Sequence, residues 1–161
     1  MQKITIRDIQ KFKDQRTPFA TVTAYDYVSA RIADAVEIPL LLVGDSAAMV
    51  VYGMDTTIPI SMEEMIFLVR AVCRGSNKSL VVADMPFMSY QASVEDAVRN
   101  AGRFVKEGGA EAVKLEGGRV YTAQIKAIID AGIPVMGHIG LLPQSYHLNS
   151  GYRIQGKTKL E

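Results

Sequence analysis

Runs of apolar residues that end in a polar residue recur along this chain. The clearest run, at 40–43, is followed by Gly44, Asp45 and Ser46. A continuous apolar run of this length is typical of a strand buried on both faces, as in a parallel sheet. We predict five strands, at 19–24, 40–43, 79–84, 112–115 and 133–138.

Helical patterns fall between these strands. Thr5, Ser61 and Ser93 are each followed three residues later by an acidic residue, a spacing that is typical of a helix start. We predict helices at about 5–15, 27–36, 61–75, 93–108 and 121–131. Strands that alternate with helices indicate consecutive βα units, and therefore an α/β fold.

Composition narrows the class of protein. The chain has 161 residues, of which 48% are hydrophobic and 22% are charged, which indicates a globular protein. The net charge of +1 comes from well-mixed charges, so no nucleic-acid partner is expected. No apolar run approaches the length that spans a membrane, and no signal segment is apparent. With Cys73 as its one cysteine, the chain is expected to be cytoplasmic.

Polar residues collect where the predicted strands end. Asp45 and Asp84 each follow an apolar run, and Glu116 follows another. The carboxyl ends of parallel strands meet at one edge of a sheet, and Mg²⁺ prefers oxygen ligands, so these acids could hold Mg²⁺. Zinc fits less well because the edge has one histidine and no thiol. The alternative is that the aspartates cap the helices that follow them.

Lys114 and His138 lie on the same predicted edge. Lys114 stands inside an apolar strand, where a lysine needs an anionic partner. It could bind a substrate carboxylate, form a Schiff base, or make a structural ion pair with Glu116 or another acid. His138, beside Gly137 and Gly140, could contact a ligand or could be an ordinary, partly buried histidine.

Six short segments of this chain are specific in combination and order, although no single one of them is. They are Thr-Ala-Tyr-Asp at 23–26, Val-Gly-Asp-Ser at 43–46, Ala-Asp-Met-Pro-Phe at 83–87, Val-Lys-Leu-Glu-Gly-Gly at 113–118, Gly-His-Ile-Gly-Leu-Leu-Pro-Gln-Ser at 137–145 and Gly-Tyr-Arg-Ile-Gln-Gly at 151–156. This set resembles the ketopantoate hydroxymethyltransferase family, and the resemblance covers essentially the whole chain.

The resemblance implies a fold and an activity. The family has a (β/α)₈ TIM barrel of the phosphoenolpyruvate/pyruvate type and commonly assembles as homo-decamers. It transfers a hydroxymethyl group from 5,10-methylenetetrahydrofolate to 2-oxoisovalerate, giving ketopantoate for pantothenate and coenzyme A biosynthesis. By resemblance, the metal residues for Mg²⁺ are Asp45, Asp84 and Glu116, the last acting through water. The substrate-binding residues are Ser46, Asp84, Lys114 and His138.

The length of the chain limits this expectation. A complete barrel of this kind needs about 250 residues. We therefore expect 1–161 to form a single domain that holds only about the first five βα units. The family's catalytic base is a glutamate after the sixth strand, beyond residue 161, so no catalytic residue is assigned and 1–161 alone is not expected to catalyse the reaction. The alternatives are another Mg²⁺-dependent 2-oxoacid lyase or aldolase, or a non-catalytic fragment.

Overall fold

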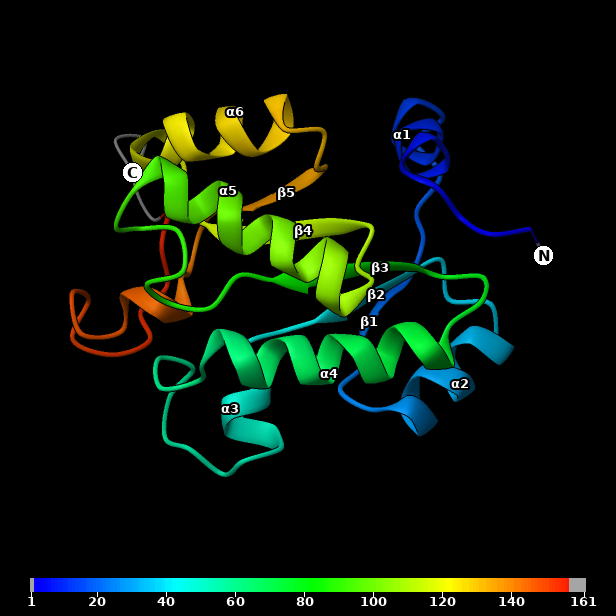
Figure 1. Cartoon of the computed structure of the whole chain (residues 1–161), viewed down its shortest axis with the longest axis horizontal. Coiled ribbons are helices and arrows are strands. Elements are labelled where there is room, and N and C mark those ends of the chain that lie inside the picture. Colours follow the sequence, from blue (N-terminus) through cyan, green and yellow to red (C-terminus); the bar gives the residue numbers. More distant parts are fainter. Residues whose placement is uncertain (1, 157–161) are drawn as a thin grey trace.

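The computed structural model describes residues 2–156 and contains one sheet of five parallel strands (Figure 1). The order of the strands in the sheet is their order in the chain, as consecutive βα units require. The strands are β1 (Thr21–Thr23), β2 (Leu40–Val43), β3 (Leu80–Asp84), β4 (Ala112–Glu116) and β5 (Val135–His138). The run at 157–161, where the expected domain ends, lies outside the described residues.

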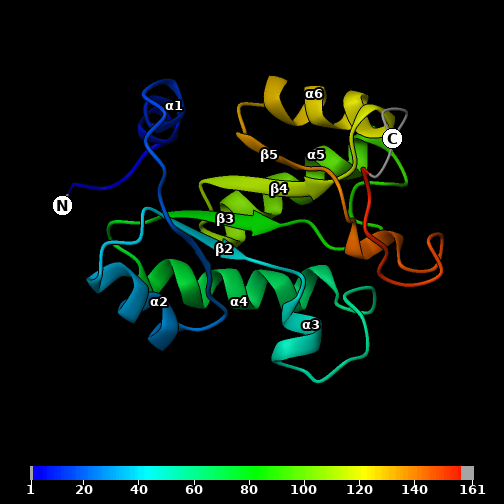
Figure 2. The same ribbon diagram turned by 180° about the vertical axis from the view of Figure 1, so that it is seen from behind.

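Helices cover the sheet mainly on one side (Figures 1 and 2). Neighbouring helices of this layer contact one another, while α1 lies apart from them at the amino ends of the strands. The helices are α1 (Ile6–Asp14), α2 (Tyr27–Ala35), α3 (Ala47–Val50), α4 (Met62–Gly75), α5 (Val94–Arg103) and α6 (Thr122–Asp130). Among the described residues, none of the helices combines the length and the apolar character needed to span a membrane.

Alternation along the strands divides the core into two parts. Leu41 and Val81 belong to the larger cluster, which packs against the helix layer. Leu40, Leu80 and Val82 belong to a smaller cluster on the opposite face, which Ile4 and α1 partly cover. Because side chains alternate, residues two positions further along a strand lie on the same face. The opposite face is therefore apolar toward the amino ends of the strands and can carry polar side chains at the carboxyl ends.

The pairing register of the strands shows which polar residues lie on the face opposite the helix layer. Val82 pairs with Ala112, and Asp84 pairs with Lys114 two positions further along. Glu116 pairs with His138 in the next pair of strands. These four polar side chains therefore project from the face opposite the helix layer, at the carboxyl edge of the sheet.

The observed helices and strands differ from the predicted ones mainly in where they begin and end. β1 is limited to three exposed residues, because it pairs only with β2 within the described chain. β4 continues to Glu116, one residue beyond the predicted end. The predicted helix at 93–108 is an α-helix to Arg103 and then a π-helix over Phe104–Gly108. The predicted helix starts are confirmed, since Thr5, Ser61 and Ser93 all cap their helices.

Candidate functional site

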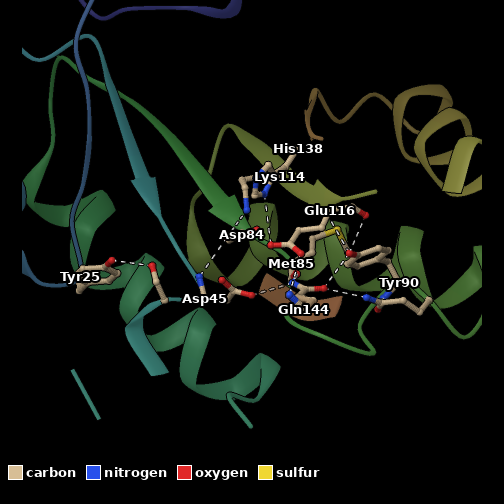
Figure 3. A network of polar contacts seen from close by, with 11 residues as sticks. Tyr25, Asp45, Asp84, Met85, Tyr90, Lys114, Glu116, His138 and Gln144 are labelled. Carbon is tan, nitrogen blue, oxygen red and sulfur yellow. Dashed lines mark hydrogen bonds and ion pairs between the residues drawn. The ribbon is translucent and has the colours of Figure 1, made fainter. Parts of the chain in front are cut away.

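The polar residues predicted from the strand ends gather at one edge of the sheet (Figure 3). Asp45 follows β2, Asp84 ends β3, and Lys114 and Glu116 come from β4. The three acids are almost completely buried, with Asp45 3%, Asp84 2% and Glu116 2% exposed. Burial of this extent removes charged groups from water, so each acid needs a compensating partner.

Lys114 supplies the one cation that directly contacts these acids among the described residues. Its Nζ lies 2.6 Å from Oδ2 of Asp84, and the backbone N–H of Asp45 donates to the same oxygen at 3.3 Å. Oδ1 of Asp84 is buried without a hydrogen-bond partner. Burial raises the pKa of Asp84 to about 7, since the desolvation cost outweighs the attraction of Lys114 and the nearby charge of Asp45 opposes ionisation. Of the roles considered for Lys114, the structural ion pair is therefore observed, and its partner is Asp84.

Glu116 is the second acid whose ionisation is opposed by its surroundings. Burial raises the pKa of its carboxyl to about 7, although the backbone N–H of Gln144 donates to Oε2 at 3.0 Å. Its other oxygen, Oε1, lies 3.4 Å from Nδ1 of His138 without the alignment of a hydrogen bond. Burial and the charge of Lys114 lower the pKa of His138, which favours a neutral imidazole at pH 7.

Gln144 is a central residue of this site that the strand pattern did not predict. Its side-chain Nε2 donates to Oδ2 of Asp45 and to the carbonyl oxygen of Met85, both at 2.9 Å. Its Oε1 lies 2.9 Å from Tyr90 Oη and from Gln91 Nε2. Gln144 comes from the loop after β5, where no periodicity marks it. Its only signal in the sequence is its place in the segment at 137–145.

Ser46 lies on the same edge but contacts a different partner. Its Oγ is 2.9 Å from Oη of Tyr25, and either hydroxyl could be the donor. Ser46 is the N-cap of α3, yet its side chain makes no capping hydrogen bond. The hydroxyl pair therefore does not serve the helix and flanks the side of the site at Asp45 (Figure 3).

Helix capping does not explain the two aspartates, so that alternative is wrong. Oδ2 of Asp45 bonds to Gln144, while Ser46 occupies the N-cap position of α3. Asp84 is followed by a loop, and α5 begins only after its own cap, Ser93. The carboxylates of Asp45 and Asp84 instead point into the polar network at the strand ends (Figure 3).

The donor set fits a hard divalent cation such as Mg²⁺. Within residues 2–156, no three Asp, Glu, His or Cys side chains lie close enough to form a complete metal cage. Mg²⁺ is usually held by one or two carboxylates, with water and substrate oxygens completing its coordination. Asp45 and Asp84 could serve in this way, and the partnerless Oδ1 of Asp84 is an oxygen that a cation would satisfy. Glu116, whose oxygens face Gln144 and His138, fits a role through water.

Comparison with known sequences gives one consistent result. A family model described as ketopantoate hydroxymethyltransferase matches residues 3–161. The chain is 55% identical over 157 residues to a 3-methyl-2-oxobutanoate hydroxymethyltransferase of Carboxydothermus hydrogenoformans, covering 98% of this chain and 57% of the relative. It is 53% identical over 158 residues to one of Thermobifida fusca, covering 98% of this chain and 56% of the relative. The chain thus spans little more than half the length of these relatives.

Comparison with solved structures confirms the fold class. A phosphonopyruvate hydrolase in complex with oxalate and Mg²⁺ matches 90% of this chain and 54% of its own, with a TM-score of 0.69 and 13% identity. A phosphoenolpyruvate phosphomutase from Streptomyces platensis subsp. rosaceus matches 81% of this chain and 52% of its own, with a TM-score of 0.66 and 16% identity. At such low identity the likeness concerns the fold alone. The predicted α/β barrel type, with about five βα units present here, is confirmed.

Proposed function

Because the chain belongs to the ketopantoate hydroxymethyltransferase family, we propose that it carries the metal- and oxoacid-binding part of an enzyme that transfers a hydroxymethyl group from 5,10-methylenetetrahydrofolate to 2-oxoisovalerate. The observation that supports this most is the 55% identity to a named relative across 98% of the chain. The convergence of Asp45, Asp84, Lys114, Glu116 and His138 on one edge supplies groups that such a reaction can use.

Asp45 and Asp84 are proposed to hold Mg²⁺, with Glu116 acting through water. When bound, Mg²⁺ would act as a Lewis acid that withdraws charge from the keto oxygen of a 2-oxoacid. The burial of Asp45 and Asp84 supports this, because little water is present to screen their charges. In such surroundings a cation interacts with carboxylates more strongly than it does in water.

Lys114, His138 and Ser46 are proposed to orient the oxoacid. The ammonium group of Lys114 lies against Asp84 and can also attract the substrate carboxylate, since an ammonium has three donor hydrogens. A neutral His138 and the hydroxyl of Ser46 can each donate one hydrogen bond to a substrate oxygen. Together these groups would hold the oxoacid in one orientation, which lowers the entropic cost of reaction.

Other parts of the proposal depend on the family resemblance. We propose a cytoplasmic homo-oligomer, with the decamer as the expected form. A different Mg²⁺-dependent 2-oxoacid lyase is less well supported, because the structural neighbours named as lyases share no more than 18% identity with this chain. A substrate panel separates the two activities, since only hydroxymethyl transfer requires the folate.

Titration calorimetry with Mg²⁺ in the presence of 2-oxoisovalerate tests the proposed metal site. We expect Asp45→Asn and Asp84→Asn each to weaken Mg²⁺ binding by about tenfold or more, because each removes an anionic ligand. Asp55→Asn, in an exposed loop, is the control and should bind as the parent does. The assignment is wrong if the double variant Asp45→Asn/Asp84→Asn, shown to be folded by circular dichroism, binds Mg²⁺ with unchanged affinity.

A further inference from the structure

We propose that Gln144 is a positioning residue that holds the acids of the site in the arrangement that binds the metal. The inference rests on the proposed function. Gln144 contacts two of the three acids at once, through its side chain to Asp45 and through its backbone N–H to Glu116. It is itself 6% exposed, so both contacts lie away from bulk water.

The contacts of the Gln144 side chain fix the orientation of its amide group. Both hydrogens of Nε2 are used, one by Oδ2 of Asp45 and one by the carbonyl of Met85. Oε1 lies against the Nε2 donor of Gln91 and the hydroxyl of Tyr90. A flipped amide would place its oxygen against two other oxygens and its NH₂ group against that of Gln91. Only one orientation is therefore compatible with these neighbours.

A fixed amide in turn fixes the carboxylate that it contacts. One oxygen of Asp45 is held by Gln144, which determines the direction in which the carboxylate presents its second oxygen. The Oε2 atom of Glu116 is held in the same way by the backbone of the same residue. Partners that orient metal ligands typically change metal affinity by about 10- to 100-fold when they are removed. Gln144 thus joins the loop after β5 to acids from β2 and β4.

The test compares two matched substitutions by calorimetry with Mg²⁺ alone, using the full chain. Gln144→Met keeps the length of the side chain but removes the donors and the acceptor of its amide, while the backbone N–H that contacts Glu116 remains. The control is Gln10→Met, on the exposed surface of α1, where the amide also donates to a carboxylate, that of Asp14, at 2.8 Å. We expect about 10- to 100-fold weaker Mg²⁺ binding for Gln144→Met, and parent affinity for Gln10→Met.

Thermal unfolding of the metal-free proteins separates positioning from a purely structural role. A structural role predicts a lower melting temperature with an unchanged Kd for Mg²⁺, measured well below the melting temperatures, and that result would overturn the inference. Gln144→Asn, whose amide is one methylene too short to keep all contacts, should also lose affinity. If neither variant folds, Gln144 is a folding residue and the inference is wrong. If the parent itself binds no Mg²⁺, the proposed metal site fails first.

Discussion

The contacts of Lys114 help to decide between binding of a substrate carboxylate and formation of a Schiff base. Its Nζ is 2.6 Å from a carboxylate oxygen of Asp84, and the side chain is only 11% exposed. In this arrangement the Nζ of Lys114 donates a hydrogen bond to Asp84, so the group is used as a donor to an anion and not as a free nucleophile. The geometry therefore supports electrostatic binding of an oxoacid by Lys114 over imine formation.

Borohydride trapping checks this role for Lys114. After incubation with 2-oxoisovalerate, Mg²⁺ and borohydride, we expect mass spectrometry to find no more reduced adduct at Lys114 than at the exposed Lys106, which measures non-specific reaction. An adduct specific to Lys114 would contradict the prediction and would indicate Schiff-base chemistry.

Asp84 and Glu116 make a prediction about the stability of the metal-free protein. Burial raises the pKa of each carboxyl to about 7, from 3.8 and 4.5 respectively. Between about pH 4 and pH 7 the folded state therefore binds more protons than the unfolded state, so stability falls as the pH rises through this window. We expect these two groups to make the free energy of urea unfolding, measured with EDTA, lower at pH 8 than at pH 5, while the lowered pKa of His138 offsets part of this change.

The matched variants for this experiment are Asp84→Asn and Glu116→Gln, which remove the titrating groups. Each should flatten the pH dependence between pH 5 and pH 8. If Asp84→Asn or Glu116→Gln keeps the pH dependence of the parent, burial does not raise the pKa of that carboxyl.

The strand pattern predicted the acids of the site but not the residues that connect them. Asp84, Lys114, Glu116 and His138 were found because side chains alternate along strands and strand ends converge in a parallel sheet. Gln144 comes from a loop, and its contacts depend on how that loop folds back over β4. A short pattern of polar and apolar residues does not show where a loop folds back onto the sheet.

At the scale of elements, Asp34 links α2 to the loop between α4 and β3. Its Oδ1 accepts hydrogen bonds from the backbone N–H groups of Lys78 at 2.7 Å and Ser79 at 2.9 Å, and from the hydroxyl of Ser76 at 3.1 Å. Burial opposes the ionisation of Asp34, but the hydrogen bonds from Ser79 and Lys78 outweigh it and lower its pKa to about 2. One carboxylate thus stabilises the connection that leads into β3.

Asp34→Ala is expected to destabilise the protein without changing its site. The lowered pKa contributes stability that is present above the unfolded pKa of 3.8 and lost as the pH falls toward 2. Urea unfolding should show a loss of about 2 to 3 kcal/mol at pH 7, decreasing toward pH 2. Asp55→Ala, in an exposed loop, is the control. An equal effect of both substitutions, or weaker Mg²⁺ binding by folded Asp34→Ala, would contradict this role.

Helix starts were easier to predict than the limits of the strands. The capping boxes at Thr5 and Ser61 are local, since the cap and its partner are three residues apart. The extent of β1 depends on its pairing with β2, and the change from α5 to a π-helix at Phe104 depends on packing. Neither of these is determined within a short window of sequence.

At the scale of the whole molecule, the sheet has two unpaired edges within the part of the chain that the structure describes. β1 and β5 each pair with a single neighbour. Between α1 and the apolar half of the open face lies a groove of about 250 Å³, lined by residues such as Leu80, Val82 and Met136. Unpaired edges and apolar grooves favour association with other chains. A polypeptide of these 161 residues is therefore expected to associate or to aggregate.

Such a polypeptide can also be tested for its ability to remove a proton from the oxoacid. With Mg²⁺ present, we expect the polypeptide to catalyse only slow deuterium exchange at the carbon next to the keto group of 2-oxoisovalerate. The family resemblance puts the base that removes this proton after a sixth strand, and a general base typically contributes about 10² to 10⁴ in rate. Proton NMR would measure the exchange, with the full-length relative from Carboxydothermus hydrogenoformans as the reference.

Exchange at the rate of that reference would contradict the prediction and would place a base within these 161 residues. Glu116 would then be the first candidate, because burial raises its pKa to about 7, the range in which a carboxylate is an effective base. Glu116→Gln would decide the point, since it keeps the shape of the side chain but removes the group that accepts the proton. Slow exchange in both the parent and Glu116→Gln is the expected result, and it would agree with a base that lies outside these residues.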